Sequence, residues 1–165
     1  MSKRQVFYSF HYEPDNWRAA TVRSIGAIEG NRPAPDNDWE TIKNGGDVAI
    51  KKWIKKQMEY RSCTIVLVGE NTANRKWINY EIVESWNSGM GVLGIYIHGL
   101  KNRQELLSNK GRNPFDFVTF KSGKKLSEIV KCYNPAGSTS KERYASIAKG
   151  LSSAVEKAIE IRQNN

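Results

Sequence analysis

The sequence lacks the long apolar runs and the cysteine pairs that mark membrane and secreted proteins. No stretch approaches the roughly 20 apolar residues of a membrane span, and the apolar run behind Lys3 and Arg4 is too short for a signal-peptide core. The two cysteines, Cys63 and Cys132, show neither a CxxC spacing nor a nearby pair of histidines. We therefore expect a soluble cytoplasmic protein with reduced thiols and no metal site.

Several short motifs of well-known enzymes are missing as well. The chain contains no GxxxxGKS/T, no HExxH and no GxSxG, and its GxGxxG spacing at 89–94 leads into an expected strand and not from a strand into a helix. These observations argue against the usual dinucleotide-binding, P-loop, zinc-protease and serine-hydrolase sites. Any nucleotide site in this protein must therefore be built differently.

The composition is that of a folded domain. The 165 residues are 39% apolar and 26% charged, and they include five Trp, seven Tyr and five Phe. This length and this apolar content suit one domain with one core and exclude a disordered chain. We expect residues 1–165 to form that single domain.

The net charge of +9 raises the question of nucleic-acid binding, but the excess is uneven. Residues 101–165 contain 13 basic and 6 acidic side chains, scattered without a recognisable nucleic-acid-binding motif. A solvated basic face is the favoured interpretation, and nucleic acid is an unlikely partner.

Hydrophobic periodicity predicts an alternation of strands and helices. The apolar runs at 62–70 and 91–99 enclose a segment with helical spacing, which indicates a parallel strand-helix-strand unit. Residues 113–120 alternate apolar and polar side chains, which favours a further strand or an edge strand. The other elements expected are a strand at 5–10, a helix at 14–30, an irregular loop at 31–46, a helix at 47–60 and a final helix at about 140–163. Within the loop, residues 38–44 could form a helical turn with Asp38 as N-cap. The fold class is α/β.

In a parallel sheet of this kind, ligands bind beyond the carboxyl ends of the strands. The residues directly after the expected strands are therefore the first candidates: Ser9, Phe10, His11, Tyr12, Gly69, Glu70, Asn71 and His98. A lone histidine is more often a packing or hydrogen-bonding residue than a catalyst, so neither His11 nor His98 is assigned a reaction from its position alone.

The expected helix at 76–89 has two distinct faces. Ile78, Ile82 and Trp86 can pack on the sheet, whereas Trp77, Glu81 and Glu84 share another face, with Glu81 one turn beyond Trp77. A carboxylate beside aromatic rings can stabilise positive charge on a sugar ring or accept a proton from a hydroxyl. The alternative is that Trp77 is core, Tyr80 a boundary residue and Glu81 merely solvated, and spacing does not decide between the two.

Three segments together resemble a known family. VFYSFHYE near the start, TIVLVGENTANRKWINYEI in the middle and VLGIYIHGLK after it look like the TIR-like proteins of bacterial anti-phage Thoeris systems. Trp77 to Glu81 reads W-x-x-x-E, a pattern also found in TIR domains. The resemblance covers a core at about 3–120. It is interrupted at 30–45, where a polar segment with prolines leaves Asp38, Trp39 and Asp47 only as possible contacts.

The resemblance implies a flavodoxin-like TIR-type domain with a short parallel sheet flanked by helices. It implies that NAD, as substrate and not as cofactor, binds beyond the strand ends and is cleaved at its nicotinamide-ribose bond. The ADP-ribose part would be cyclised or transferred to give a signal, with the cyclic form favoured, and this signal would activate a separate effector protein. Glu81 would be the catalytic residue, with Trp77 and Tyr80 shaping the pocket and Ser9, Phe10 and His11 lining the nucleotide site.

The activity still has alternatives. The domain could be a non-catalytic TIR-type signalling and interaction module that self-associates into a homo-oligomer. A nucleic-acid binder is the third hypothesis, and it rests only on the basic final third. The resemblance places the NAD-cleaving signal synthase first.

Overall fold

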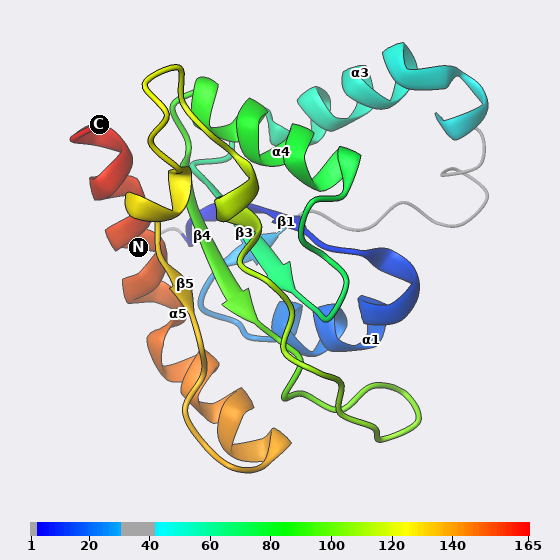
Figure 1. The fold of residues 1–165 in the computed structure, drawn as a ribbon. Coiled ribbons are helices and arrows are strands. Elements are labelled where there is room, and N and C mark those ends of the chain that lie inside the picture. Colours follow the sequence, from blue (N-terminus) through cyan, green and yellow to red (C-terminus); the bar gives the residue numbers. More distant parts are fainter. Residues whose placement is uncertain (1–2, 31–41) are drawn as a thin grey trace.

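The strands of this protein form a single parallel sheet, shown in Figure 1 for a computed structural model that describes residues 3–30 and 42–165. In this part of the chain the strand order is β2-β1-β3-β4-β5. The strands are β1 (Gln5–Ser9), β2 (Glu29–Gly30), β3 (Cys63–Val68), β4 (Gly91–Tyr96) and β5 (Cys132–Tyr133). This order is that of the flavodoxin-like doubly wound fold, and it confirms the α/β class expected from the sequence.

The two central strands owe their place to their composition. Every residue of β3 and of β4 is buried, which matches their continuous apolar sequence. They pair in parallel from Cys63 opposite Gly91 to Val68 opposite Tyr96, and α4 (Lys76–Asn87) connects them. The predicted strand-helix-strand unit is therefore confirmed.

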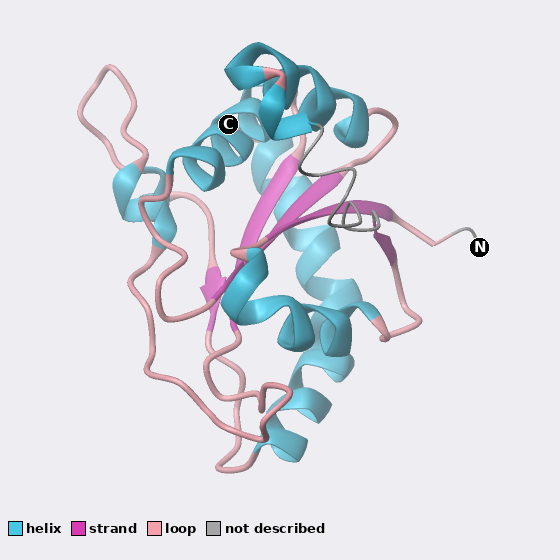
Figure 2. Ribbon diagram, turned by 90° about the vertical axis from the view of Figure 1, so that its right-hand side faces the viewer, coloured by secondary structure: helices cyan, strands magenta, loops and turns pink. Residues whose placement is uncertain are grey.

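Helices cover both faces of the sheet, and Figure 2 shows the sheet between the two layers. α1 (Tyr12–Arg23) and α5 (Ser140–Gln163) pack on one face through buried residues such as Val22 and Leu151. α3 (Gly46–Met58) and α4 cover the other face through residues such as Ile54 and Ile82. None of the described helices is both long enough and apolar enough to cross a membrane.

Two details at the end of the first helix differ from the sequence-based expectations. The first helix ends at Arg23, not at residue 30, and Glu29–Gly30 forms the short edge strand β2. Ile25 and Ile28 are buried, but they pack from the turn between these two elements and not from a helix face. Their apolar spacing therefore extended the expected helix too far.

Residues 113–120 do not form a sheet strand. Pro114–Phe117 is the short 3-10 helix η1, which starts at Pro114 and is capped by Asn113 accepting from the Phe115 backbone N–H. A second 3-10 turn, η2 (Leu126–Glu128), follows, and Thr119 makes only an isolated antiparallel bridge to Lys125. The edge strand is instead β5, whose Cys132 pairs with Gly94. Most of the loop expected at 31–46 lies outside the described residues. Of the possible helical turn at 38–44, residues 42–44 are described, and they are helical.

Candidate active site

Glu81 lies in the middle of α4, and protein surrounds its carboxyl group. The residue keeps partial exposure, whereas desolvation raises the pKa of its carboxyl to about 8. The carboxyl group is therefore desolvated although part of the residue is exposed. Glu81 is thus not the fully solvated surface residue that the alternative interpretation of this helix supposed.

Ser9 is the residue that β1 brings to Glu81. Side chains alternate along a strand, so Val6 and Tyr8 face α1 and α5, whereas Phe7 and Ser9 face α3 and α4. Ser9 is fully buried. Its hydroxyl favours the charged form of Glu81 and so lowers the pKa of that carboxyl, although desolvation raises the same pKa by more. Ser9 Oγ makes no hydrogen bond of normal geometry to any described residue, which is uncommon for a buried hydroxyl.

Trp77 and Tyr80 form an aromatic wall in the first turns of α4. Their rings meet edge to face with centroids 5.7 Å apart, and both side chains are half-buried. They pack against the cluster that contains Phe7 of β1 and Ile50 of α3, on the same face of the sheet as Ser9. Trp77 precedes Glu81 by one helical turn, so ring and carboxyl lie on one side of the helix.

The two residues after β1, Phe10 and His11, have different surroundings. Phe10 packs against the α1 and α5 cluster, with its ring 6.1 Å from that of Tyr12, so the structure does not bring it to the side of Glu81. His11 directly precedes α1, and its Nδ1 is buried without a hydrogen-bond partner among the described residues. Desolvation, followed by the positive charge of Arg75, lowers the pKa of His11 and favours the neutral imidazole.

His98 belongs to a different part of the same edge. It follows β4, which is separated from β1 by β3, so the two strands lie about 10 Å apart at normal strand spacing. Its ring lies 6.1 Å from that of Tyr96, and desolvation together with Arg143 and Lys110 lowers its pKa. His98 therefore follows a strand that is not a neighbour of the strand that ends at Ser9.

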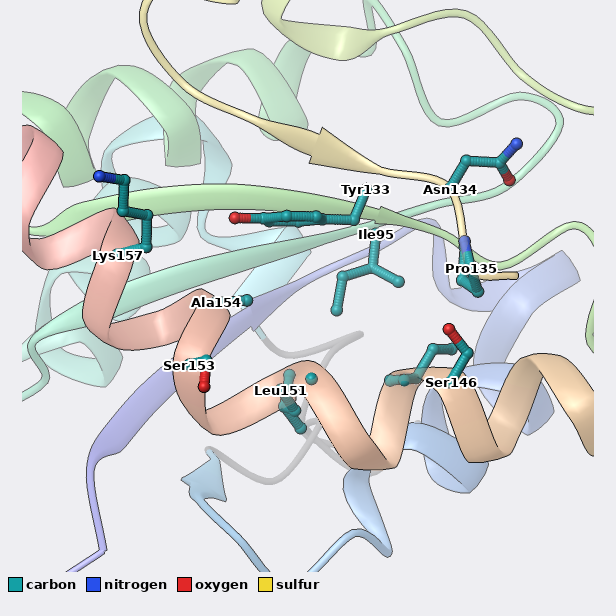
Figure 3. Close-up of a pocket in the computed structure, with 11 residues that line it drawn as sticks. Ile95, Tyr133, Asn134, Pro135, Ser146, Leu151, Ser153, Ala154 and Lys157 are labelled. Atoms are coloured by element: carbon teal, nitrogen blue, oxygen red, sulfur yellow. The ribbon is translucent and has the colours of Figure 1, made fainter. Parts of the chain in front are cut away.

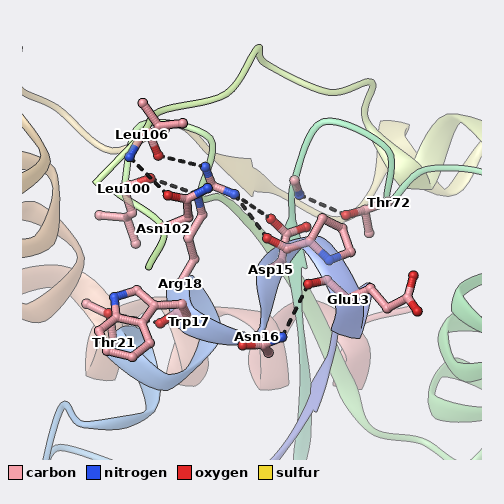
Figure 4. Close-up of polar contacts among 12 residues, drawn as sticks. Glu13, Asp15, Asn16, Trp17, Arg18, Thr21, Thr72, Leu100, Asn102 and Leu106 are labelled. Atoms are coloured by element: carbon pink, nitrogen blue, oxygen red, sulfur yellow. Dashed lines mark hydrogen bonds and ion pairs between the residues drawn. The ribbon is translucent and has the colours of Figure 1, made fainter. Parts of the chain in front are cut away.

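A buried ion pair at this edge is missing from the sequence-based candidates. Arg18 and Asp15 of α1 are 3% and 1% exposed, and Arg18 Nη1 lies 3.0 Å from Asp15 Oδ1 (Figure 4). The i, i+3 spacing of an acid and a base in PDNWR was the available signal, but such pairs are usually exposed. Their burial becomes visible only in the fold.

A cavity of about 380 Å³ lies on the opposite face of the sheet from Glu81, between β5 and α5. Figure 3 shows Ile95 and Tyr133 on its sheet side and Leu151 and Ala154 on its helix side. This cavity is lined mainly by apolar side chains and contains no carboxylate. The described residues also include no group of three or more His, Cys, Asp or Glu side chains that could hold a metal ion.

A carboxyl on the helix after β3, beside the carboxyl end of β1, occupies the place where this sheet order binds ligands. The fold and the W-x-x-x-E arrangement of Trp77 and Glu81 together define a TIR-like domain. The model of the family described as Thoeris protein ThsB, TIR-like domain, matches residues 7–102, and the chain belongs to this family.

A curated relative supports the same family. The chain is 36% identical over 134 residues to a protein of Bacillus cereus (strain MSX-D12) named "Putative cyclic ADP-D-ribose synthase ThsB1". The match covers 76% of this chain and 69% of the relative. It therefore spans most of both proteins and extends past the segment that the family model matches.

Proposed function

We propose that this protein is an NAD-cleaving enzyme that breaks the nicotinamide-ribose bond and makes a cyclic ADP-ribose signal. The proposal agrees with the name of the Bacillus cereus relative. The observation that carries it is the desolvated Glu81 carboxyl, which lies against Ser9 at the carboxyl end of β1. The signal would act in the cytoplasm on a separate effector protein, as part of a defence against phage.

The chemistry needs one well-placed carboxylate. When the bond between the ribose C1′ and the nicotinamide nitrogen breaks, the electron pair leaves with the nitrogen and neutralises the pyridinium ring. The ribose then has oxocarbenium character, and the ionised Glu81 stabilises this positive charge from its desolvated position. A nucleophile of the same ADP-ribose then attacks C1′ and closes the ring, whereas attack by water gives free ADP-ribose.

The raised pKa suits a site that binds a cation. Near neutral pH the empty site holds Glu81 mainly in its protonated form, because its pKa is about 8. The positively charged nicotinamide ring favours ionisation of a neighbouring carboxyl, so bound NAD shifts Glu81 toward the form that the reaction uses. If a hydroxyl is the attacking group, the same carboxylate can accept its proton.

The surrounding residues have distinct parts in this proposal. Trp77 and Tyr80 offer aromatic surface against which a flat ring can pack. Ser9 Oγ, which lies against Glu81, and His11 Nδ1 are buried polar atoms with no hydrogen bond of normal geometry to the described residues, and hydroxyl and phosphate oxygens of a nucleotide could satisfy them. Phe10 contributes by anchoring the loop after β1, because its ring packs on the sheet face that α1 and α5 cover.

The test uses purified protein and NAD, with free nicotinamide and ADP-ribose products followed by mass spectrometry. Glu81→Gln is the informative variant, and Glu84→Gln, on the same helix and also only partly exposed, is its matched control. Product from wild type and Glu84→Gln, with loss of at least about a hundredfold in Glu81→Gln, supports the proposal. An inactive wild type that self-associates, both alone and in lysate of phage-infected cells, would support the interaction module instead.

A further inference from the structure

Arg18 makes an unusually large number of contacts for one buried side chain. Beside its ion pair with Asp15, its Nε donates to the Leu100 carbonyl at 2.7 Å and its Nη2 to the Leu106 carbonyl at 3.0 Å. Its Nη1 also donates to the Pro14 carbonyl at 3.3 Å. Figure 4 shows the guanidinium between Asp15 and the two distant carbonyls. These contacts join α1 to the loop that follows β4.

Asp15 extends the same connection to the loop after β3. Its second oxygen, Oδ2, lies against Gly69 so closely that a Cβ on Gly69 would be 2.0 Å away. The Gly69 N–H donates to Thr72 Oγ1 at 2.8 Å, which closes a turn in this loop. Asp15 Oδ2 itself has no hydrogen-bond partner among the described residues. Backbone and carboxylate thus pack directly at the end of β3.

The ion pair therefore connects three loops at the edge where ligands bind in this fold. The loop after β1 contains His11, the loop after β3 leads into α4 with Glu81, and the loop after β4 starts at His98. Burying two charges costs free energy that their attraction and hydrogen bonds often only offset, so stability alone is a weak reason for such a pair. A role in positioning these loops would explain why the Asp15–Arg18 ion pair is buried here.

We propose that Arg18 is a positioning residue for the NAD site, which sets the loops after β1 and β3 at the spacing that substrate binding requires. This inference rests on the proposed function. Arg18 does not touch the reacting atoms; it acts through Asp15 of α1, which lies against Gly69 in the loop that leads into α4. Misplacement of a binding group by about 1 Å can cost up to a hundredfold in rate.

The test compares two arginines that differ in their place on the sheet. Arg18→Lys keeps the charge but loses the fork that reaches several carbonyls at once. Arg61 also donates to two backbone carbonyls, those of Gln57 and Val6, but at the amino end of the strands. Arg61→Lys is therefore the matched control. We expect Arg18→Lys to raise KM for NAD roughly tenfold with kcat changed less than about threefold, and Arg61→Lys to leave KM unchanged.

Hydrogen exchange gives a second readout that needs no turnover. In Arg18→Lys the amides of Asn102 and Ser108, which are hydrogen-bonded within the loop after β4, should exchange at least about tenfold faster than in wild type. Unchanged exchange, or an equal rise of KM in both lysine variants, overturns the positioning role. If Arg18→Lys does not fold, Asp15→Asn replaces it and is expected to raise KM in the same direction; an unchanged KM overturns the role.

The two proposals fail in different ways. Wild-type protein that neither binds nor cleaves NAD overturns the proposed function and with it this inference. An active wild type whose Arg18→Lys variant keeps its KM overturns only the inference about Arg18. NAD binding to Glu81→Gln, measured by calorimetry, separates a failure of binding from a failure of chemistry.

Discussion

The buried hydroxyl of Ser9 lies against the desolvated carboxyl of Glu81, although the two residues come from the first strand and from the helix after the third. The hydroxyl opposes the effect of burial, because it favours the charged carboxylate. This relationship makes the ionisation of Glu81 depend on a neighbour that can be changed without altering Glu81 itself.

Ser9→Ala should therefore shift the pH dependence of the reaction. Loss of the hydroxyl removes an effect that lowers the pKa of Glu81, so the pKa should rise above its value of about 8. The alkaline rise of kcat/KM for nicotinamide release should move to higher pH by the same amount. Ser62→Ala, at the opposite end of the sheet, is the control. An unshifted profile in Ser9→Ala would separate Ser9 from Glu81.

Glu81 should also make the fold less stable as pH rises. Its pKa is about 8 in the folded protein and near 4.5 in the unfolded chain, so between these values the folded state binds more protons. The free energy of unfolding must then fall as pH rises from about 4.5 to 8, with a slope from this group of at most about 1.4 kcal/mol per pH unit. Glu81→Gln should remove this slope in urea titrations at pH 5, 7 and 9. A variant with the wild-type slope would mean that the carboxyl is ionised throughout.

Trp77 and Trp86 both belong to α4, but their surroundings differ. Trp77 is half-buried beside Glu81, whereas Trp86 is in the core, meets Phe120 edge to face and has the Arg162 guanidinium over its ring. We expect Trp77→Ala to lower kcat/KM about tenfold with a modest change of Tm, and Trp86→Phe to lower Tm with kcat/KM unchanged. Steady-state kinetics and thermal unfolding of both variants provide the test, and the reverse pattern would remove Trp77 from the substrate site.

Two glycines should respond to alanine in opposite directions. Gly69→Ala would place a Cβ against the Asp15 carboxylate, where no flexible chain end can move aside, so we expect a loss of about 1–3 kcal/mol. Gly150→Ala, in the interior of α5 with open space around its Cβ, should gain about 0.5–1 kcal/mol. Urea unfolding measures both changes. Equal stability of the two variants would contradict the packing at the end of β3.

The sequence predicts the centre of this fold well because its signals there are local. The continuous apolar runs of β3 and β4 are typical of strands that are buried on both faces of a parallel sheet, and α4 between them repeats its apolar residues at helical spacing. The edge strands are two residues long, too short for any periodicity, so β2 and β5 were missed. Their pairing is fixed by the neighbouring strands and not by their own residues.

The candidate site divides in the same way. Glu81 could be singled out because Trp77 lies one turn before it, and the roles of both, with those of Ser9, His11 and Tyr80, stay predictions. The Arg18 network could not be found, because its partners at Leu100 and Leu106 are 82 and 88 residues away in the chain. Contacts of this kind come from the packing of loops and leave no local pattern.

The most direct measurement is the release of nicotinamide from NAD by wild type, Glu81→Gln and Glu84→Gln at about pH 8, near the pKa of Glu81, followed by mass spectrometry of the ADP-ribose product. The proposed function predicts a cyclic ADP-ribose product from wild type and Glu84→Gln and a loss of at least about a hundredfold in Glu81→Gln. Wild-type rates in Glu81→Gln would contradict the central claim that this carboxylate performs the reaction.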